Sequence, residues 1–354
     1  MARILFVDVL VQNSIHIGRR QTAINLAVVW LIHIGAIKVN SGIITQGAVI
    51  ALYNYMSQIL VELIKLANLI VTITKAVACG NRIQNALEIT PSVSDGEGAS
   101  PAAAAGENAV SFENVTLRYH SSAAPALSNI NFCVKAGETV GIIGGTGSGK
   151  TSLVNMIARF YDAESGSVKV FGTDVRTYRL KELREMIGIV PQKAVLFSGS
   201  IRQNMLWGKN TATDSEINRA LEIAQAKEIV DKKDGGLDFE VEQFGRNLSG
   251  GQRQRLTIAR ALVKDPKILI LDDSASALDF ATDAALRSSL KEACVGITVF
   301  IVSQRTSSVM SADKIIVLEN GEAVGIGSHS DLLENCEVYR EIYNSQFKGG
   351  KGNE

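Results

Sequence analysis

A glycine-rich segment from Gly144 to Thr151 (GGTGSGKT) has the residue types and spacing of a loop that binds phosphate groups. An apolar, β-branched run at 139–143 precedes it and the helix-like SLVNMIARF follows, so the segment lies between a strand and a helix. Glycines let the backbone curl with its N–H groups toward phosphates, and the helix N-terminus adds partial positive charge. We therefore expect a nucleotide to bind at Gly144, Gly145, Thr146, Gly147, Ser148, Gly149, Lys150, Thr151 and Ser152.

Two side chains of this loop and one downstream carboxylate form a candidate site for nucleotide phosphates and Mg²⁺. The Lys150 amine would reach the outer phosphates, and the Thr151 hydroxyl would ligate Mg²⁺. Residues 268–272 (ILILD) read as an apolar strand that ends in Asp272, where a carboxylate can hold the Mg²⁺ shell. The alternative is that Asp272 only caps a strand end; the upstream phosphate loop favours the metal role.

A third motif lies between these two. LSGGQRQR, from Leu248 to Arg255, precedes LTIARALV, which reads as a helix. In this order and spacing, the motifs make residues 110–345 resemble the ATP-binding-cassette family. Alone, SGGQ would equally be explained as a polar helix cap. In the family two cassettes pair head to tail, and the signature of one completes the ATP site of the other. The resemblance assigns that role to Leu248, Ser249, Gly250, Gly251 and Gln252.

The same resemblance implies further site residues. Tyr119 matches the aromatic residue that stacks on adenine, and Gln192 matches the glutamine that senses Mg²⁺ and the attacking water. The loop that crosses the dimer interface is matched by Ser276, Ala277, Leu278 and Asp279. The implied cofactors are ATP and Mg²⁺, with Thr151, Gln192 and Asp272 at the metal. The stretch LFSGSIRQNMLWG (196–208) is typical of exporters.

Two catalytic positions depart from the family pattern. The family's catalytic base is a Glu, and here that position is Asp273; the family's switch His is here Gln304. Both belong, with Gln192, to the site built on this chain's own phosphate loop, whereas the signature is intact. This split favours a heterodimer with a second half-transporter over a homodimer: the chain's own site would be slow, and its signature would complete the partner's site. The alternative is a homodimer in which Asp273 and Gln304 serve as base and switch.

Two apolar stretches precede the cassette. No charged residue occurs from 21 to 37 or from 39 to 61, and each stretch is close to the roughly 20 residues that span a bilayer. We expect transmembrane helices at about 21–39 and 43–64, the second extending into the cytoplasm. Basic residues flank the pair while Lys38 alone lies between, which places both ends inside. The alternative is a buried helical hairpin of a soluble protein.

The expected fold class is therefore a transmembrane hairpin, similar to the last two of six helices of an exporter half, followed by an α/β P-loop cassette with an antiparallel β subdomain and a helical subdomain. The expected division is an unassigned N-terminal segment (1–20), the two helices (21–89), a Gly-, Pro- and Ala-rich flexible linker (90–109), the cassette (110–345) and a flexible tail (346–354). Because four helices of such a half do not precede the hairpin, the sequence would be a fragment, have a misplaced start, or come from a broken locus.

The predicted function is ATP hydrolysis coupled to outward transport of an unidentified solute, in a multi-pass protein of the plasma membrane with a cytoplasmic cassette and lipid around its helices. A formal net charge of zero gives no case for nucleic acid, and four cysteines without metal-type spacing give none for a metal centre of their own. One alternative is a truncated, non-transporting ATP-binding regulatory or interaction protein. Another is a soluble cassette enzyme, which the apolar hairpin disfavours.

Overall fold

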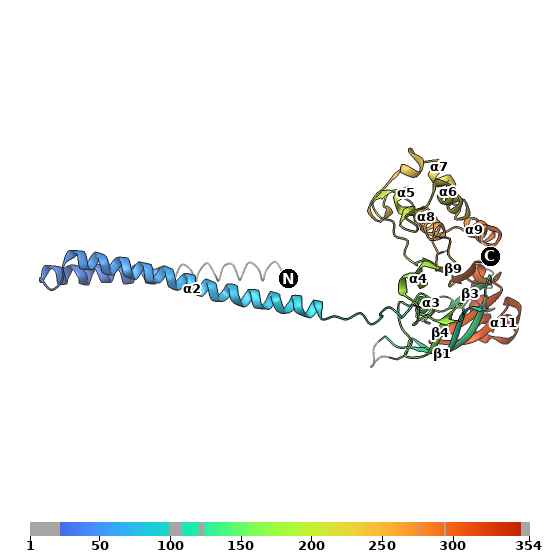
Figure 1. The fold of residues 1–354 in the computed structure, drawn as a ribbon, viewed down its shortest axis with the longest axis horizontal. Helices are drawn as coiled ribbons and strands as arrows, with labels where there is room; N and C mark the ends of the chain where they lie inside the picture. Colours follow the sequence, from blue (N-terminus) through green and yellow to red (C-terminus); the bar gives the residue numbers. More distant parts are fainter. Residues whose placement is uncertain (1–21, 99–107, 120–123, 275, 294, 348–354) are drawn as a thin grey trace, which may run out of the picture. The chain divides into compact units, whose positions relative to one another are not determined.

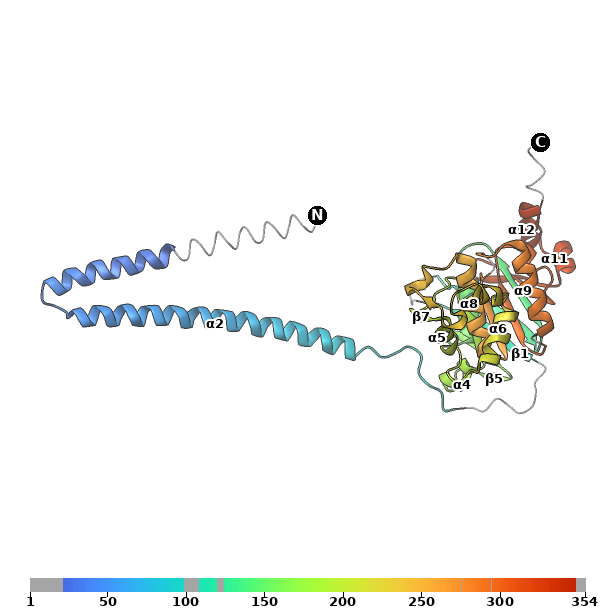
Figure 2. The same cartoon turned by 90° about the horizontal axis from the view of Figure 1, so that it is seen from above.

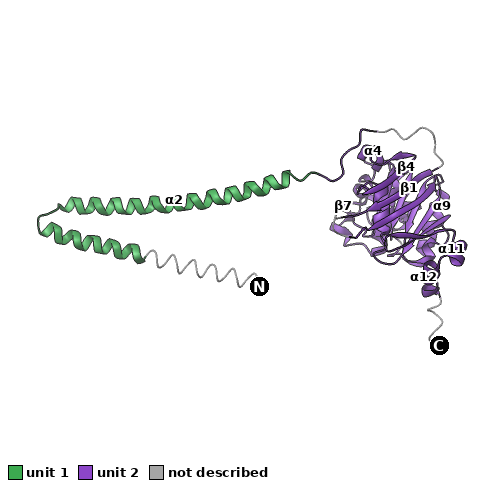
Figure 3. Ribbon diagram, turned by 90° about the horizontal axis from the view of Figure 1, so that it is seen from below, with its two compact units in different colours: residues 1–90 green, residues 91–354 purple. Residues whose placement is uncertain are grey.

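The computed structural model describes residues 22–98, 108–119, 124–274, 276–293 and 295–347. The chain divides into two compact units, residues 1–90 and 91–354 (Figure 3). The predicted N-terminal segment 1–20 lies outside the described residues, as do the later part of the linker and most of the tail.

The first unit is a helical hairpin. A helix from Thr22 to Asn40 runs antiparallel to the start of α2, which is continuous from Gln46 to Leu87 (Figure 2). Thr45 caps the N-terminus of α2: its hydroxyl oxygen accepts a hydrogen bond from the Ala48 backbone N–H at 3.3 Å. A Cβ at Gly35 would lie 2.7 Å from a methyl group of Val49, so glycine permits the close approach of the two helices.

The hairpin exposes almost all of its apolar side chains. No residue of α2 is buried, and Trp30 on the preceding helix is 69% exposed. Both helices are long and apolar enough to cross a membrane, yet their most apolar stretches are only 6% and 0% buried. A core helix of a soluble protein would be mostly buried, so this exposure disfavours the soluble-hairpin alternative and indicates that lipid or further helices cover these faces.

A six-stranded sheet forms the centre of the second unit. Its strand order is β12-β11-β3-β10-β9-β6, parallel from β11 to β6 with β12 antiparallel at one edge. Every residue of β9 and β10 is buried, as expected for a parallel sheet covered on both faces. The strands are β3 (Thr139–Gly144), β6 (Ile187–Val190), β9 (Ile268–Asp272), β10 (Thr298–Val302), β11 (Lys314–Glu319) and β12 (Glu322–Gly327).

A second sheet is antiparallel, with the order β2-β1-β4-β5. Burial alternates along β2, which leaves one face of the strand for the core and the other for solvent. The rings of Phe112 and Phe132 stack across β1 and β2 with centroids 4.6 Å apart. The strands are β1 (Asn108–Leu117), β2 (Leu127–Lys135), β4 (Ser165–Val170) and β5 (Thr173–Asp174).

Helices α5 to α8 gather in a separate lobe of the second unit (Figure 1). This lobe consists of α5 (Ile201–Leu206), α6 (Asp214–Ile223), α7 (Lys227–Asp231) and α8 (Gly250–Val263), with the short strands β7 (Gly199–Ser200) and β8 (Glu240–Val241) and the 3-10 turns η1 (Gly236–Asp238) and η2 (Gln243–Gly245). The other helices are α3 (Lys150–Ile157), α4 (Leu180–Glu185), α9 (Phe280–Ala293), α10 (Thr306–Val309), α11 (His329–Asn335) and α12 (Glu337–Phe347). The unit thus has the α/β, antiparallel and helical parts that the sequence predicts.

The described start of the linker is fixed to the second unit, although its composition predicts flexibility. The Asp95 carboxylate accepts a hydrogen bond from the Leu180 backbone N–H at 2.8 Å and so caps α4, whose own N-cap residue, Arg179, supplies no side-chain bond. The Gly96 N–H donates to the Tyr178 carbonyl at 3.1 Å. A Cβ at Gly96 would lie 2.5 Å from the backbone of Thr177, so only glycine lets the chain approach this closely. These hydrogen bonds hold the described start of the linker against the second unit, and the flexible linker at 90–109 stays a prediction.

Candidate nucleotide site

Four neighbouring strands of the parallel sheet position the site. β6, β9, β10 and β3 are adjacent and parallel, so the segments that follow them meet at one edge of the sheet. These segments carry Gln192, Asp273, Gln304 and the phosphate loop. They enclose a cavity of about 310 Å³, which is lined by Tyr119, Ala126, Thr146, Gly147, Gly149, Lys150, Thr151, Ser152, Gln192, Asp272, Asp273, Val302 and Gln304.

The phosphate loop has the conformation that its glycines predict. Gly149 precedes α3 with φ of 97°, and a Cβ there would lie 2.8 Å from the Ala126 carbonyl, so a larger residue is excluded by both strain and space. The Lys150 ammonium donates to the carbonyls of Gly144 and Gly145 at 2.8 and 2.6 Å. Burial lowers the pKa of Lys150, and the nearby carboxylates of Asp273 and Asp272 partly oppose this. The loop thus presents a cation and a helix N-terminus to one side of the cavity.

Asp272 and Thr151 lie together at the base of the cavity. The Thr151 hydroxyl donates to a carboxylate oxygen of Asp272 at 3.3 Å. Asp272 is 6% exposed, and burial raises its pKa, assisted by the negative charge of Asp273 and opposed by the Thr151 hydrogen bond. The Asp272 carboxylate and the Thr151 hydroxyl are oxygen ligands of the kind that Mg²⁺ prefers. A bound Mg²⁺ would also compensate the negative charge of the buried carboxylate.

Asp273 and Gln192 contact each other across the cavity. The Gln192 side-chain amide donates to a carboxylate oxygen of Asp273 at 3.2 Å, and the Asp273 backbone N–H donates to the Val302 carbonyl at 2.9 Å. Asp273 adopts a left-handed backbone conformation with φ of 48°, which Asp tolerates better than most residues other than glycine. Two of the three predicted catalytic side chains therefore touch, and the third, Gln304, lines the same cavity.

Tyr119 lies at the mouth of the cavity. Its hydroxyl donates to the Ser152 hydroxyl at 2.7 Å, and its ring packs edge-on against Tyr161 with centroids 4.8 Å apart. Tyr119 is 45% exposed, so part of its surface is accessible to a nucleotide base. Three residues near the nucleotide cavity were not predicted from the sequence. Tyr161 belongs to the aromatic pair Phe160-Tyr161 shortly after α3, and its ring contacts Tyr119. Ala126 and Val302 carry no motif and line the cavity only because the fold brings them there.

The signature does not line this cavity. Ser249 and Gln252 form a reciprocal cap at the start of α8: the Gln252 backbone N–H donates to the Ser249 hydroxyl at 3.3 Å, and the Ser249 backbone N–H donates to the side-chain Oε1 of Gln252 at 3.0 Å. SGGQ therefore does form the polar helix cap that was the alternative interpretation, and Gly250 is exposed at the N-terminus of α8. A Cβ at Gly251 would lie 3.3 Å from the Ala277 carbonyl, so the signature adjoins the predicted interface loop.

The interface loop itself connects the base position to α9. The Ser276 hydroxyl donates to the Asp273 carbonyl at 2.9 Å, and the Asp279 carboxylate accepts from the Thr282 N–H at 2.9 Å. These bonds tie the loop to the nucleotide cavity at one end and to the start of α9 at the other.

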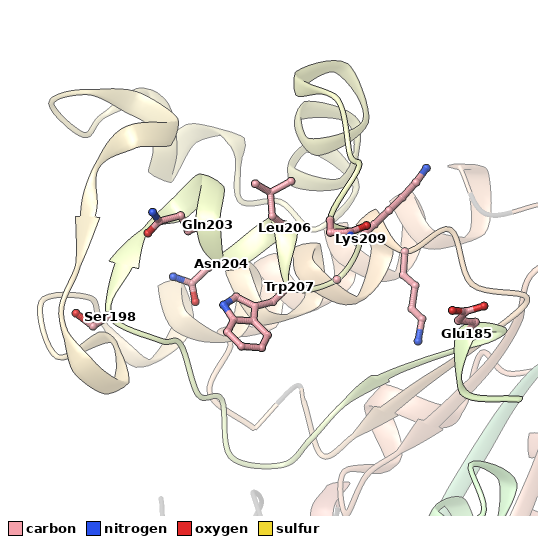
Figure 4. Close-up of a pocket in the computed structure, with 10 residues that line it drawn as sticks. Glu185, Ser198, Gln203, Asn204, Leu206, Trp207 and Lys209 are labelled. Carbon is pink, nitrogen blue, oxygen red and sulfur yellow. The ribbon is translucent and has the colours of Figure 1, made fainter. Parts of the chain in front are cut away.

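A larger hollow of about 810 Å³ lies on the helical lobe, and Figure 4 shows its labelled side chains. It is lined by Glu185, Ser198, Gln203, Asn204, Leu206, Trp207, Gly208, Lys209, Asn210 and Lys264. Trp207 is 70% exposed, and its ring lies 5.0 Å from that of Phe197. This hollow contains none of the phosphate-loop residues, so the smaller cavity is the nucleotide candidate.

Comparisons with known proteins agree with this geometry. Residues 127–276 match the family model described as ABC transporter. An uncharacterized ABC transporter ATP-binding protein, YfiB, from Bacillus subtilis is 40% identical over 93% of this chain and 56% of its own length. An ATP-dependent lipid A-core flippase from Vibrio vulnificus is 34% identical over 93% of this chain and 56% of its own. A solved bacterial Atm1-family ABC exporter with ATP bound matches with a TM-score of 0.74 and 31% identity, over 91% of this chain and 57% of that one.

Residues 127–276 are therefore similar to the ABC transporter family, and the fold of a helical hairpin followed by an α/β cassette matches the Atm1-family exporter over 91% of this chain. The likeness to exporters also agrees with the predicted plasma-membrane location and cytoplasmic cassette. The chain spans a little over half the length of the curated relatives that it matches.

Proposed function

We propose that this chain is the C-terminal part of an ABC exporter half-transporter that binds and hydrolyses ATP to move a solute outward across the plasma membrane. In this proposal its own ATP site is slow, and its signature completes a faster site on a different half-transporter. The observation that carries the proposal is the contrast between Asp273 and Gln304 in one cavity and an intact Ser249–Gln252 segment on the exposed start of α8.

The geometry around Asp273 supports a slow site. Asp is one methylene shorter than Glu, and the Gln192 amide already holds one of its carboxylate oxygens at 3.2 Å. A base that is misplaced by about 1 Å can cost about a hundredfold in rate. Gln304 can hydrogen-bond a γ-phosphate, but its amide neither carries a positive charge nor moves a proton at neutral pH.

The cofactors proposed for this site are ATP and Mg²⁺. Lys150 and the loop N–H groups would bind the phosphates, Tyr119 would stack on adenine, and Thr151, Gln192 and Asp272 would hold the metal. Mg²⁺ would neutralise phosphate charge. The chain's own residues orient the water through Gln192 and Asp273 and exclude bulk solvent from the buried Asp272.

The intact signature and the exposed hairpin are the surfaces that we propose contact partners. The open N-terminus of α8 offers backbone N–H groups to an anion, and the adjoining Ser276–Asp279 loop would lie at the interface. The exposed apolar faces of the hairpin would meet membrane lipid and other transmembrane helices. A lipid is one candidate for the transported solute, because one relative is named as an ATP-dependent lipid A-core flippase.

ATP turnover by the purified full-length chain tests the slow-site proposal. The chain alone should hydrolyse ATP slowly, and Asp273→Asn should lower that slow rate further. A fast rate for the chain alone that Asp273→Asn leaves unaffected would contradict the proposal. A fast rate that Asp273→Asn abolishes would instead support the homodimer alternative, with Asp273 as a fully effective base.

A further inference from the structure

Helix α12, near the C-terminus, is hydrogen-bonded to Gln304–Thr306, which we call the switch segment. Gln346, near the end of α12, accepts a hydrogen bond from the Thr306 backbone N–H through its side-chain oxygen at 2.8 Å. Its side-chain nitrogen donates to the Gln304 carbonyl at 2.7 Å. One amide therefore bridges both sides of Arg305, and the bridged segment carries the side chain that lines the nucleotide cavity.

Gln304 and Arg305, the first two residues of the switch segment, belong to neither neighbouring element, so hydrogen bonds from elsewhere in the chain help to fix their position. β10 ends at Val302, and the four-residue helix α10 begins at Thr306. Arg305 occupies the N-cap position of α10 and gives no side-chain cap, so the first N–H groups of the helix depend on outside acceptors. Gln346 supplies one of these acceptors from a residue 40 positions away.

Helix α12, which carries Gln346, is held in place by buried contacts with the core of the second unit. Tyr339 of α12 is fully buried, and its hydroxyl lies 2.7 Å from Nδ1 of His329. Val338 and Ile342 pack against the same core. Gln346 follows Tyr339 by seven residues, about two helical turns, so the buried anchor and the amide lie on one face of α12.

We propose that Gln346 is a positioning residue that holds the Gln304–Thr306 segment so that Gln304 faces the γ-phosphate of bound ATP. The proposal rests on the proposed function only in requiring that ATP binds at the phosphate loop. It assigns α12 a role in distinguishing ATP from ADP, since ADP has no γ-phosphate for Gln304 to contact.

The two hydrogen bonds of the Gln346 side chain require an amide. An amide accepts with its oxygen and donates with its nitrogen, whereas an ionised carboxylate only accepts. In Gln346→Glu the Thr306 bond can persist, but a carboxylate would face the Gln304 carbonyl. Protonation of that carboxyl group at low pH would restore a donor. In Gln346→Met the length is kept and both hydrogen bonds are lost.

The experiment measures binding by the full-length chain in detergent with Mg²⁺, using displacement of a fluorescent nucleotide by ADP or by a non-hydrolysable ATP analogue. For Gln346→Met we expect about tenfold weaker binding of the ATP analogue, the equivalent of one lost hydrogen bond, and unchanged binding of ADP. Gln346→Glu should also bind the ATP analogue weakly at pH 8, where its ionised carboxylate cannot donate a hydrogen bond to the Gln304 carbonyl. Glu341→Met, on an exposed part of the same helix, serves as the control and should change neither affinity.

A double variant tests whether Gln346 acts through Gln304. Gln304→Ala should weaken the ATP analogue, and adding Gln346→Met should cause no further loss. Equal weakening of ADP and ATP analogue, additive losses in the double variant, or no effect of Gln346→Met would each overturn the proposal. Failure of the proposed slow site would appear separately, as fast hydrolysis by the chain alone, because these binding measurements involve no turnover.

Discussion

Replacing Asp273 by Glu tests the geometry of the base directly. The added methylene extends the side chain by about 1.5 Å, which is the length of one carbon–carbon bond. The present carboxylate is held by Gln192 at 3.2 Å, and the longer one would reach further into the cavity toward the water. The shorter side chain of Asp can lower the hydrolysis rate by up to about a hundredfold. Asp273→Glu should therefore raise ATP turnover at the chain's own site by about ten- to a hundredfold.

The same substitution should lower stability, because the backbone at this position is left-handed with φ of 48°. That conformation costs ordinary L-residues roughly 1–2 kcal/mol and Asp less, so Glu should lose about 1 kcal/mol. For a unit of this size the thermal midpoint should fall by about 2–4 °C. Asp273→Glu should therefore be faster and less stable, because the longer side chain raises turnover while the left-handed backbone lowers the free energy of unfolding.

The assay is steady-state phosphate release by the full-length chain with Mg²⁺ and ATP, over a range of protein concentrations. If two copies pair, each would complete the site of the other, so we expect turnover per chain to rise with concentration. Asp273→Asn is the matched control without a base, and Gln304→His added to Asp273→Glu should raise the rate again. The reasoning is refuted if Asp273→Glu is no faster than the wild-type chain while Asp273→Asn abolishes a fast wild-type rate.

Three further predictions concern other parts of the structure. Asp95→Ala should remove the cap of α4 and lower the free energy of unfolding by about 1 kcal/mol, whereas Asp95→Asn should retain most of it; a denaturant titration measures both. Gly149→Ala should abolish nucleotide binding in an equilibrium titration, since its Cβ would meet the Ala126 carbonyl at 2.8 Å; wild-type affinity would contradict the loop geometry. Burial raises the pKa of Tyr339 to about 12, so its contribution to stability should be complete below about pH 10 and lost between pH 10 and 12; unfolding measured against pH should show a smaller loss over that range for Tyr339→Phe.

The sequence predicts the parts of the site that are local along the chain. The phosphate loop, the strand ending in Asp272 and the start of α8 at Ser249 each depend on a few neighbouring residues, and the structure has a loop, strand and helix at those places. Spacing alone does not give the strand order. That order brings Gln192, 81 positions before Asp273, into contact with its carboxylate.

Long-range contacts of ordinary polar residues could not be predicted. Asp95 lies in a stretch whose composition indicates a loose linker, yet its carboxylate meets an uncapped helix 85 positions away. Gln346 gives no motif signal, because one glutamine near the end of an amphipathic helix is unremarkable until the fold places it beside Gln304. In both cases the partner is a backbone group, and a backbone group has no sequence signature.

The central claim is that the two ATP sites of a pair differ, with this chain's signature serving the faster one. The direct test co-expresses the chain with a half-transporter that has the catalytic Glu and His, and measures ATP turnover of the complex. Ser249→Asp keeps a good helix cap but places a negative charge where the partner's ATP would bind, with Ser249→Asn as the neutral control. We expect Ser249→Asp to remove most of the turnover and Asp273→Asn to remove little. Loss of most turnover with Asp273→Asn and little with Ser249→Asp would contradict it.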